Sequence, residues 1–170
     1  MDFPQLIELR RSVRRYSVDP VDPAVLERIL RMVSRAPSAG NLQAYRICVV
    51  RSARKRKALS LAAGGQEFLS QAPIDLVFFA DSERSSATYG DRGASLYAVQ
   101  DATIAATFAV LAATHEGLAS AWVGAFDEST VQSICGEREL RPIAIVPIGH
   151  AAEKPDATSR RDLEEIVTEL

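Results

Sequence analysis

Residues 95–116 read SLYAVQDATIAATFAVLAATHE and form the longest helical pattern in the chain. Small residues recur along it at helical spacing and make a wide stripe, formed by Val99, Ala102, Ala106, Ala109, Val110 and Ala113. Because small side chains let neighbouring elements approach closely, this helix is predicted to be central in the fold. Gly117 follows as its C-cap.

Shorter elements flank this helix on both sides. Asp22 and Pro23 form an N-cap followed by proline at the first helical position. Three shorter helices are predicted over residues 23–36, 53–61 and 127–135, ended by Pro37, by the glycines at 64–65 and by Gly136. Four short apolar runs, over residues 47–50, 74–79, 119–123 and 143–148, are predicted to be strands. Pro142 and Pro147 place the last of them at a sheet edge or a strand end.

Size and composition favour one domain spanning residues 1–170. The chain has 170 residues, 47% of them hydrophobic, and a formal net charge of -2, so it can bury a core unaided and has no general attraction for nucleic acid. The start lacks a signal-peptide pattern, and no run of about 18 uninterrupted apolar residues occurs. We therefore expect a cytoplasmic protein with no membrane partner.

The C-terminal segment, the cysteines and the histidines each add one expectation. Residues 150–170 carry too little apolar surface for a core of their own and are read as an arm that packs elsewhere, a second subunit being one option. Cys48 and Cys135 are each interpreted as small core residues without a disulfide. The two histidines lie near no cluster with metal-ligand spacing, so no metal site is expected.

Three clusters could carry chemistry, and each has a plainer alternative. The stretch LRRSVR at residues 9–14 gathers guanidinium and hydroxyl donors for an anionic group, or is a solvated basic helix end. The stretch APSAGNLQAY at 36–45 allows close approach of a flat ligand, or is ordinary turn chemistry. The stretch WVGAFDE at 122–128 leads into a helix N-terminus that favours an electron-rich atom, whereas Trp122 and Phe126 can also be core aromatics.

The order and spacing of these clusters resemble the FMN-dependent nitroreductase family. Further matches are GQEF at 65–68 before Ala72-Pro73, YGDRG at 89–93 leading to YAVQD at 97–101, PIGH at 147–150 and Arg160-Arg161. The resemblance extends nearly end to end. It implies an α+β fold, with a mixed, mainly antiparallel sheet surrounded by helices, assembled as an intertwined homodimer with FMN at the subunit interface.

The resemblance also implies roles for individual residues. Those matching contacts to the FMN phosphate, ribityl chain and pyrimidine edge are Arg10, Arg11, Ser12 and Arg14. Those matching a loop donated by the other subunit are Pro37, Ser38, Ala39 and Asn41. Gly65 and Gln66 match contacts to the flavin's polar edge, and Gly124 and Ala125 match the backbone that approaches flavin N5. Arg160 and Arg161 match phosphate contacts, with the choice between them left open because Asp162 replaces a frequent proline.

The implied activity is oxidation of NADH or NADPH by the flavin, followed by reduction of a nitroaromatic, quinone or related small acceptor in a ping-pong cycle. The flavin carries the chemistry, so no catalytic side chain is required, and the sequence shows no familiar catalytic motif. Ala44-Tyr45 replaces a frequent proline-tryptophan pair and could alter the pocket wall. Two alternatives are another flavin reaction on the same scaffold, such as dehalogenation or azoline oxidation, and a non-catalytic FMN-binding protein.

Overall fold

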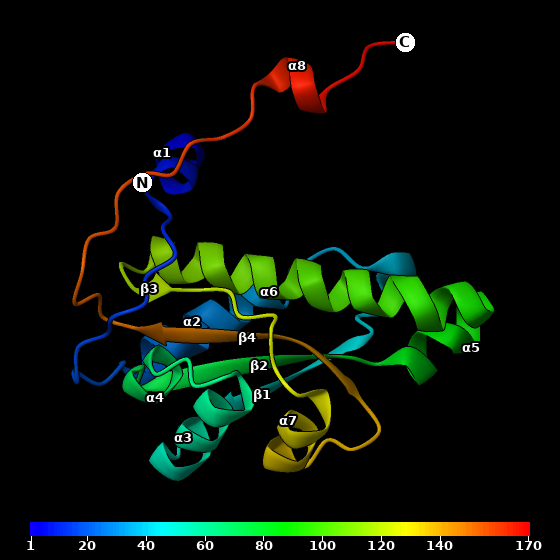
Figure 1. The fold of residues 1–170 in the computed structure, drawn as a ribbon. Helices are drawn as coiled ribbons and strands as arrows, with labels where there is room; N and C mark the ends of the chain where they lie inside the picture. Colours follow the sequence, from blue (N-terminus) through cyan, green and yellow to red (C-terminus); the bar gives the residue numbers. More distant parts are fainter.

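A four-stranded sheet forms the middle layer of the protein (Figure 1). The computed structural model describes all 170 residues. Along the sheet the strands are β1 (Tyr45–Val50), β2 (Ile74–Ala80), β4 (Arg141–Gly149) and β3 (Ala119–Ser120). The strand pairs are antiparallel, and an isolated parallel bridge joins Ser12 to Ser120. This arrangement confirms the predicted mainly antiparallel α+β architecture.

Helices cover both faces of the sheet, since alternate residues of each buried strand point to opposite sides. One face, with Ile74, Leu76 and Phe78, packs against α2 (Pro23–Val33) and α6 (Ala98–His115). The opposite face, with Val77, Phe79 and Ile145, packs with α3 (Ala53–Ala62), α4 (Phe68–Gln71) and α7 (Glu128–Cys135). Figure 1 shows the resulting three layers.

The long alanine-rich helix is central, as predicted. Of the residues in α6, nine are buried, seven of them alanines. The helix begins at Ala98, whereas the sequence pattern placed its start at Ser95. The preceding α5 (Ser82–Arg92) and a wide turn over Gly93–Tyr97 fold back tightly, since a Cβ at Gly93 would lie 2.5 Å from the carbonyl oxygen of Ser85.

Residues 82–115 form a helical stretch that is long and apolar enough to cross a membrane by length and composition alone. Half of its most apolar window is buried inside the protein. Its α6 part packs against β1, β2, β4 and α2, as the core helix of a soluble protein does.

Of the two positions predicted for Pro142 and Pro147, the sheet edge is wrong, because β4 lies between β2 and β3. The prolines lie toward the two ends of the strand instead, since Pro142 is its second residue and Pro147 lies two residues before Gly149. Ile145 exchanges both backbone hydrogen bonds with Val123, at 2.9 and 3.0 Å, so its N–H points toward the β3 side. Backbone N–H directions alternate along a strand, and the missing N–H of Pro147 therefore faces the same side. The ladder is interrupted there, between the Val123 bridge and the Ser120 pair.

Two element boundaries also differ from the prediction. The strand expected over 119–123 is limited to Ala119–Ser120 plus the bridge at Val123, which follows from the interruption at Pro147. The helix expected to reach Pro37 ends at Val33, and turns with Ala36 N–H donating to the Val33 carbonyl occupy the gap.

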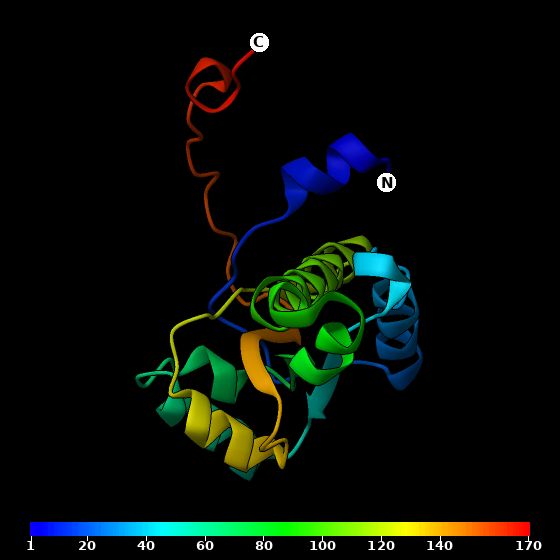
Figure 2. The ribbon, with the colours of Figure 1, turned by 90° about the vertical axis from the view of Figure 1, so that its right-hand side faces the viewer.

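Both terminal segments project from the three-layered body on the same side (Figure 2). They contain α1 (Phe3–Leu9) and, within the last 20 residues, α8 (Leu163–Ile166). Their apolar side chains are open to solvent in the single chain: Phe3 is 68% exposed and Leu163 is 73% exposed. The isolated chain therefore leaves apolar surface uncovered at both ends.

Candidate functional site

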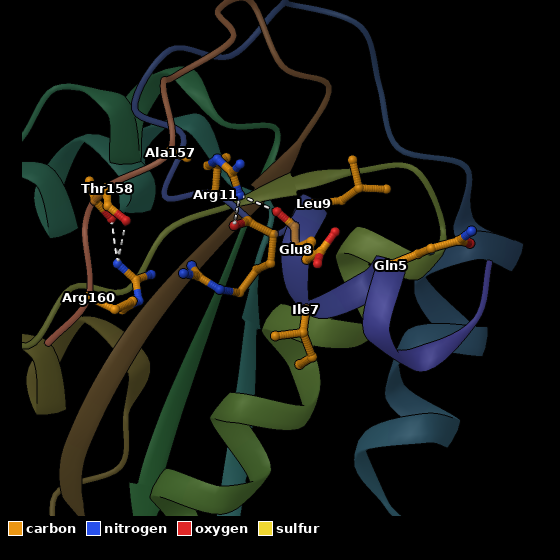
Figure 3. A pocket seen from close by; sticks show the side chains of 9 residues that line it. Gln5, Ile7, Glu8, Leu9, Arg11, Ala157, Thr158 and Arg160 are labelled. Atoms are coloured by element: carbon orange, nitrogen blue, oxygen red, sulfur yellow. Dashed lines mark hydrogen bonds between the residues drawn. The ribbon is translucent and has the colours of Figure 1, made fainter. Parts of the chain in front are cut away.

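An arginine cluster, formed by Arg10, Arg11, Ser12, Arg14 and Arg160, lies between the two terminal segments. It lines a cavity of about 220 Å3 that adjoins a wider one of about 990 Å3. Figure 3 shows Thr158 and Arg160 on one wall of the wider cavity and residues of α1 on the other. Segments from opposite ends of the sequence thus bring these donors together.

The charge of this cluster is largely uncompensated. None of its four arginines forms an ion pair, and Asp156 is the one acidic residue lining the smaller cavity. The Arg14 backbone N–H donates to Glu153 at 2.6 Å, which leaves the guanidinium unused. A doubly charged phosphate group matches such a set of bidentate donors.

Two arginine positions are clarified by the structure. Arg160 lines both cavities, and its guanidinium donates to Thr158 Oγ1 at 2.6 Å (Figure 3). Arg161 instead pairs with Glu165 at 2.8 Å and lies outside the cluster. The Arg11 side chain donates to the carbonyl oxygens of Glu8 and Arg10 at the end of α1. The alternative interpretation of the stretch at 9–14, a basic helix end, therefore applies in part to Arg11.

The arginine cluster is continuous with the stretch at 122–128. Ser12 bridges to Ser120, and the Val13 N–H donates to the Ser120 carbonyl at 3.0 Å. After Ser120 the chain bridges to β4 once more, at Val123, and passes Gly124 before entering α7. The buried Ser120 hydroxyl, which has no hydrogen-bond partner, lies at this junction.

The predicted residues at 65–66 join the same region. The Gln66 side chain donates to the Ala63 carbonyl at 2.9 Å and approaches the Ala125 carbonyl at 3.5 Å. Trp122 is 39% exposed and is not a core residue, whereas Phe126 packs against the buried cluster beneath the sheet. The two aromatics therefore have different roles, and the backbone around Gly124 remains open to a ligand.

The loop at 37–44 lies elsewhere in the chain. It contains a short 3-10 turn, Ala39–Asn41, and three residues with positive φ: Gly40 at 56°, Asn41 at 57° and Gln43 at 49°. Ala39 lies against the first turn of α6, because its N–H donates to Asp101. At the other end of α6, Arg11 of the arginine cluster lines a cavity of about 180 Å3 together with Thr114 and Gly117.

The predicted site residues therefore fall into two groups within one chain. Asp101 and Thr114, which these contacts involve, are 13 residues apart, so about 20 Å of helix separates them at about 1.5 Å per residue. The first group contains residues 10–14, 65–66, 124–125 and Arg160, and the second is the loop at 37–44. The two groups therefore lie apart within one chain.

Sequence reasoning missed two features of these regions. Asp101, which holds the loop at 37–44, is the only charged residue in the small-residue stretch at 98–113, and that signal was available. The thiols of Cys48 and Cys135 interact with each other, close to the Arg46–Glu137 ion pair. The two cysteines therefore form an interacting pair, whereas the sequence suggested two unrelated core residues. Both cysteines are free thiols, as predicted.

Comparison with known proteins gives consistent matches. Residues 7–65 and 60–150 match the model of the Nitroreductase family. The NADH dehydrogenase of Thermus thermophilus is 33% identical, over 93% of this chain and 91% of its own length. The FMN reductase (NAD(P)H) of Bacillus subtilis is 30% identical over 85% of this chain and 64% of its own length.

A solved structure matches as well. The NADPH:FMN oxidoreductase of Vibrio harveyi, complexed with NAD+, superposes with a TM-score of 0.89 at 25% identity, over 98% of this chain and 76% of its own. The fold and the sequence thus define a protein of nitroreductase type. The chain belongs to the Nitroreductase family.

Proposed function

We propose that the protein is an FMN-dependent oxidoreductase that takes electrons from NADH or NADPH and passes them to a small acceptor such as a nitroaromatic compound or a quinone. The relatives named for FMN and for NAD(P)H support this assignment. FMN, when bound, supplies the electron transfer between the nucleotide and the acceptor. The protein's part is to bind, orient and shield the reacting groups.

One observation supports the shared site most directly: the loop at 37–44 contacts α6 near its start, at Asp101, whereas Arg11 of the other group lies near its end, beside Thr114. Two chains related by a two-fold axis, with their α6 helices antiparallel, would place the loop of one chain beside the arginine cluster of the other. We therefore propose a homodimer with two equivalent sites, each built from both subunits.

The exposed apolar surface supports the same assembly. A groove of about 490 Å3 is lined mainly by apolar side chains of α1, α2 and α6, among them Phe3, Leu6, Met32 and Phe108. The C-terminal arm, residues 150–170, adds Leu163, Ile166 and Val167, all exposed. We propose a single domain over residues 1–170 whose arm covers the partner subunit.

The donors present fit a flavin mononucleotide. Arg10, Arg11, Ser12 and Arg160 would hold the phosphate and ribityl chain, since none of these arginines forms an ion pair. Arg14 would lie toward the pyrimidine edge, where positive charge stabilises a reduced, anionic flavin. Arg160 is preferred to Arg161 for the phosphate, because Glu165 already neutralises Arg161.

Backbone groups would complete the site. Gly124 and Ala125 present main-chain atoms at the open end of the sheet, and Gly65 and Gln66 lie beside them. Pro37, Ser38, Ala39 and Asn41 of the partner subunit's loop would cover the other side of the ring. We place the protein in the cytoplasm, where NADH and NADPH are available.

The test is the visible absorption spectrum of the purified protein, followed by anaerobic addition of NADH or NADPH. A flavin spectrum that bleaches is the expected result. Bound flavin that no nucleotide reduces would leave a flavin-binding protein with another role. Absence of flavin after FMN is supplied would contradict the proposal.

The shared site has its own test in Ile166→Asp, which places a charge on an exposed apolar residue of the arm. The variant should dissociate on a sizing column and release FMN together. A matched change at Leu61, which is exposed on α3 away from the arm, should leave both properties unchanged. A monomer that keeps FMN would contradict the shared site.

A further inference from the structure

Asp101 is a buried carboxylate in the first turns of α6 that forms no ion pair. Its side chain is part of a residue that is 2% exposed. Oδ1 accepts a hydrogen bond from the Ala39 N–H at 2.9 Å, and Oδ2 accepts one from the Ala44 N–H at 3.3 Å. One carboxylate thus holds both ends of the six-residue segment from 39 to 44.

The segment it holds has an unusual backbone. Asn41 and Gln43 adopt left-handed φ values that residues other than glycine rarely occupy, with Gly40 beside them. Such conformations persist only where the surroundings fix them. The contacts inside the segment are local: Ser38 Oγ accepts from the Gln43 N–H, and the Gln43 side chain donates to the Asn41 carbonyl.

Contacts from α5 are less protected. Arg84, an exposed residue, donates to the Leu42 carbonyl. The Tyr89 hydroxyl lies so close to Gly40 that a Cβ at this position would be 2.3 Å from it. Asp101 is the buried charged contact to the segment and the only one that acts at both of its ends. Hydrogen bonds to ionised groups are stronger than neutral ones, and stronger still out of water.

We propose that Asp101 is a positioning residue that fixes residues 38–41 in the conformation that meets the flavin bound by the other subunit. The presence of a bound flavin in this inference rests on the proposed function. The positioning role of Asp101 rests on its two hydrogen bonds to the loop. A carboxylate is needed because both of its oxygens are acceptors facing N–H donors. An asparagine of the same size would keep one bond and turn an NH2 group toward the second N–H.

The first experiment compares the wild-type chain with Asp101→Asn and with Asp22→Asn. Asp22 is the control because its carboxylate also accepts from a backbone N–H, that of Ala24 at 2.8 Å, but at the start of α2. Titration with FMN gives the dissociation constant, visible circular dichroism reports the flavin's surroundings, and urea unfolding reports stability. We expect Asp101→Asn to raise the FMN dissociation constant about tenfold and to alter the dichroism, with Asp22→Asn unchanged in both.

An Asp101→Asn variant that binds FMN with unchanged affinity and dichroism would overturn the proposal. So would weaker binding with unchanged dichroism, because that pattern indicates a loss of stability without displacement of the loop.

Hydrogen exchange on the FMN-free wild-type chain provides a test that needs neither flavin nor a folded variant. The Ala39 and Ala44 amides should exchange slowly although they lie at the ends of a loop, and fast exchange at both would overturn the clamp. If the wild-type chain binds no FMN, the proposed function fails. Protected amides at 39 and 44 would then still show the clamp while removing its role in flavin binding.

Discussion

Asp75 provides a quantitative prediction about stability. It is the second residue of β2, fully buried, and neither carboxyl oxygen has a hydrogen-bond partner. Burial raises the pKa of Asp75 well above the ordinary value of 3.8, and the nearby Arg56 guanidinium lowers it in part. Arg56 itself donates to the carbonyls of Ser70 and Ala72 and does not bond to the carboxylate.

The sign of the pH dependence follows from this raised pKa. Between the unfolded and folded pKa values of Asp75, the native chain binds more protons than the unfolded chain. The free energy of unfolding therefore falls as pH rises through that interval, by up to about 1.4 kcal/mol per pH unit. Below the pKa of Asp75 in the unfolded chain, the carboxyl is protonated in both states and no stability is lost. Above its pKa in the folded chain, the loss of unfolding free energy has reached its full size.

Asp75→Asn keeps the size of the side chain and removes the titration. The variant should match the wild type in its charge state at acid pH and should exceed it in stability at neutral pH, by about 1.4 kcal/mol for each unit by which burial raises the pKa of Asp75. Urea unfolding of both proteins from about pH 4 to about pH 8 measures the difference. Using the difference cancels the other titrating groups, which the two chains share.

Asp91→Asn is the control, because Asp91 is exposed and its carboxylate makes no hydrogen bond. Its stability curve should run parallel to that of the wild type. If the difference between Asp75→Asn and the wild type did not change with pH, the carboxyl of Asp75 would not be held neutral, and the reasoning from its burial would be refuted.

Three further predictions concern the site and the thiols. Arg160→Ala should weaken FMN binding about tenfold or more, measured by fluorescence titration, whereas Arg161→Ala should change it less than about twofold because Glu165 already pairs with Arg161; equal effects would contradict the assignment. Gly124→Val should slow flavin reduction in stopped flow by up to about 100-fold with little change in melting temperature, since a Cβ there meets Trp122 only at 3.5 Å; a normal rate would refute the placement. Interaction with Cys135 lowers the pKa of Cys48 below its ordinary value, so the midpoint of the pH dependence of Cys48 alkylation should lie below that of a free thiol and should move upward in Cys135→Ala; an unmoved midpoint would exclude this cause.

The elements with the strongest patterns were predictable from sequence. The alanine-rich α6 and the two apolar strands β1 and β2 were predicted to within three residues at each boundary. For β2 the reason is burial on both faces, which requires a continuous apolar run. The N-cap Asp127 and the left-handed Gly136 fixed α7 at both ends. Local chemistry determines such features, so the sequence is sufficient to locate them.

The position of β4 was not predictable in the same way. Pro147 suggested an edge, yet the strand is interior, because its neighbour β3 is short and leaves the ladder where Pro147 has no N–H to donate. Whether a proline is tolerated depends on which side of the strand it faces. That side is set by pairing between residues that lie 22 to 30 positions apart in the sequence, from the Val123–Ile145 bridge to the Ala119–Gly149 pair, which local patterns do not encode.

The candidate site also combines features that the sequence indicated with features that depend on contacts the sequence does not reveal. The residues of the three clusters were recognisable by type, and the donors around Arg10, Arg11 and Ser12 do line a cavity. The choice between Arg160 and Arg161 depended on Glu165, a partner four residues away that the basic pair itself does not reveal. The thiol contact between Cys48 and Cys135 joins a strand to a distant helix and had no sequence signal.

The projecting C-terminal segment has a consequence for synthesis. Residues 150–170 leave the ribosome after the sheet and α6 have been made. If this segment docks on the partner subunit, as proposed, then assembly can be completed only after the segment has emerged. Until then, Phe3 and the other exposed apolar residues of α1 remain uncovered, so synthesis at low temperature, where hydrophobic association is weaker, should increase the yield of soluble protein.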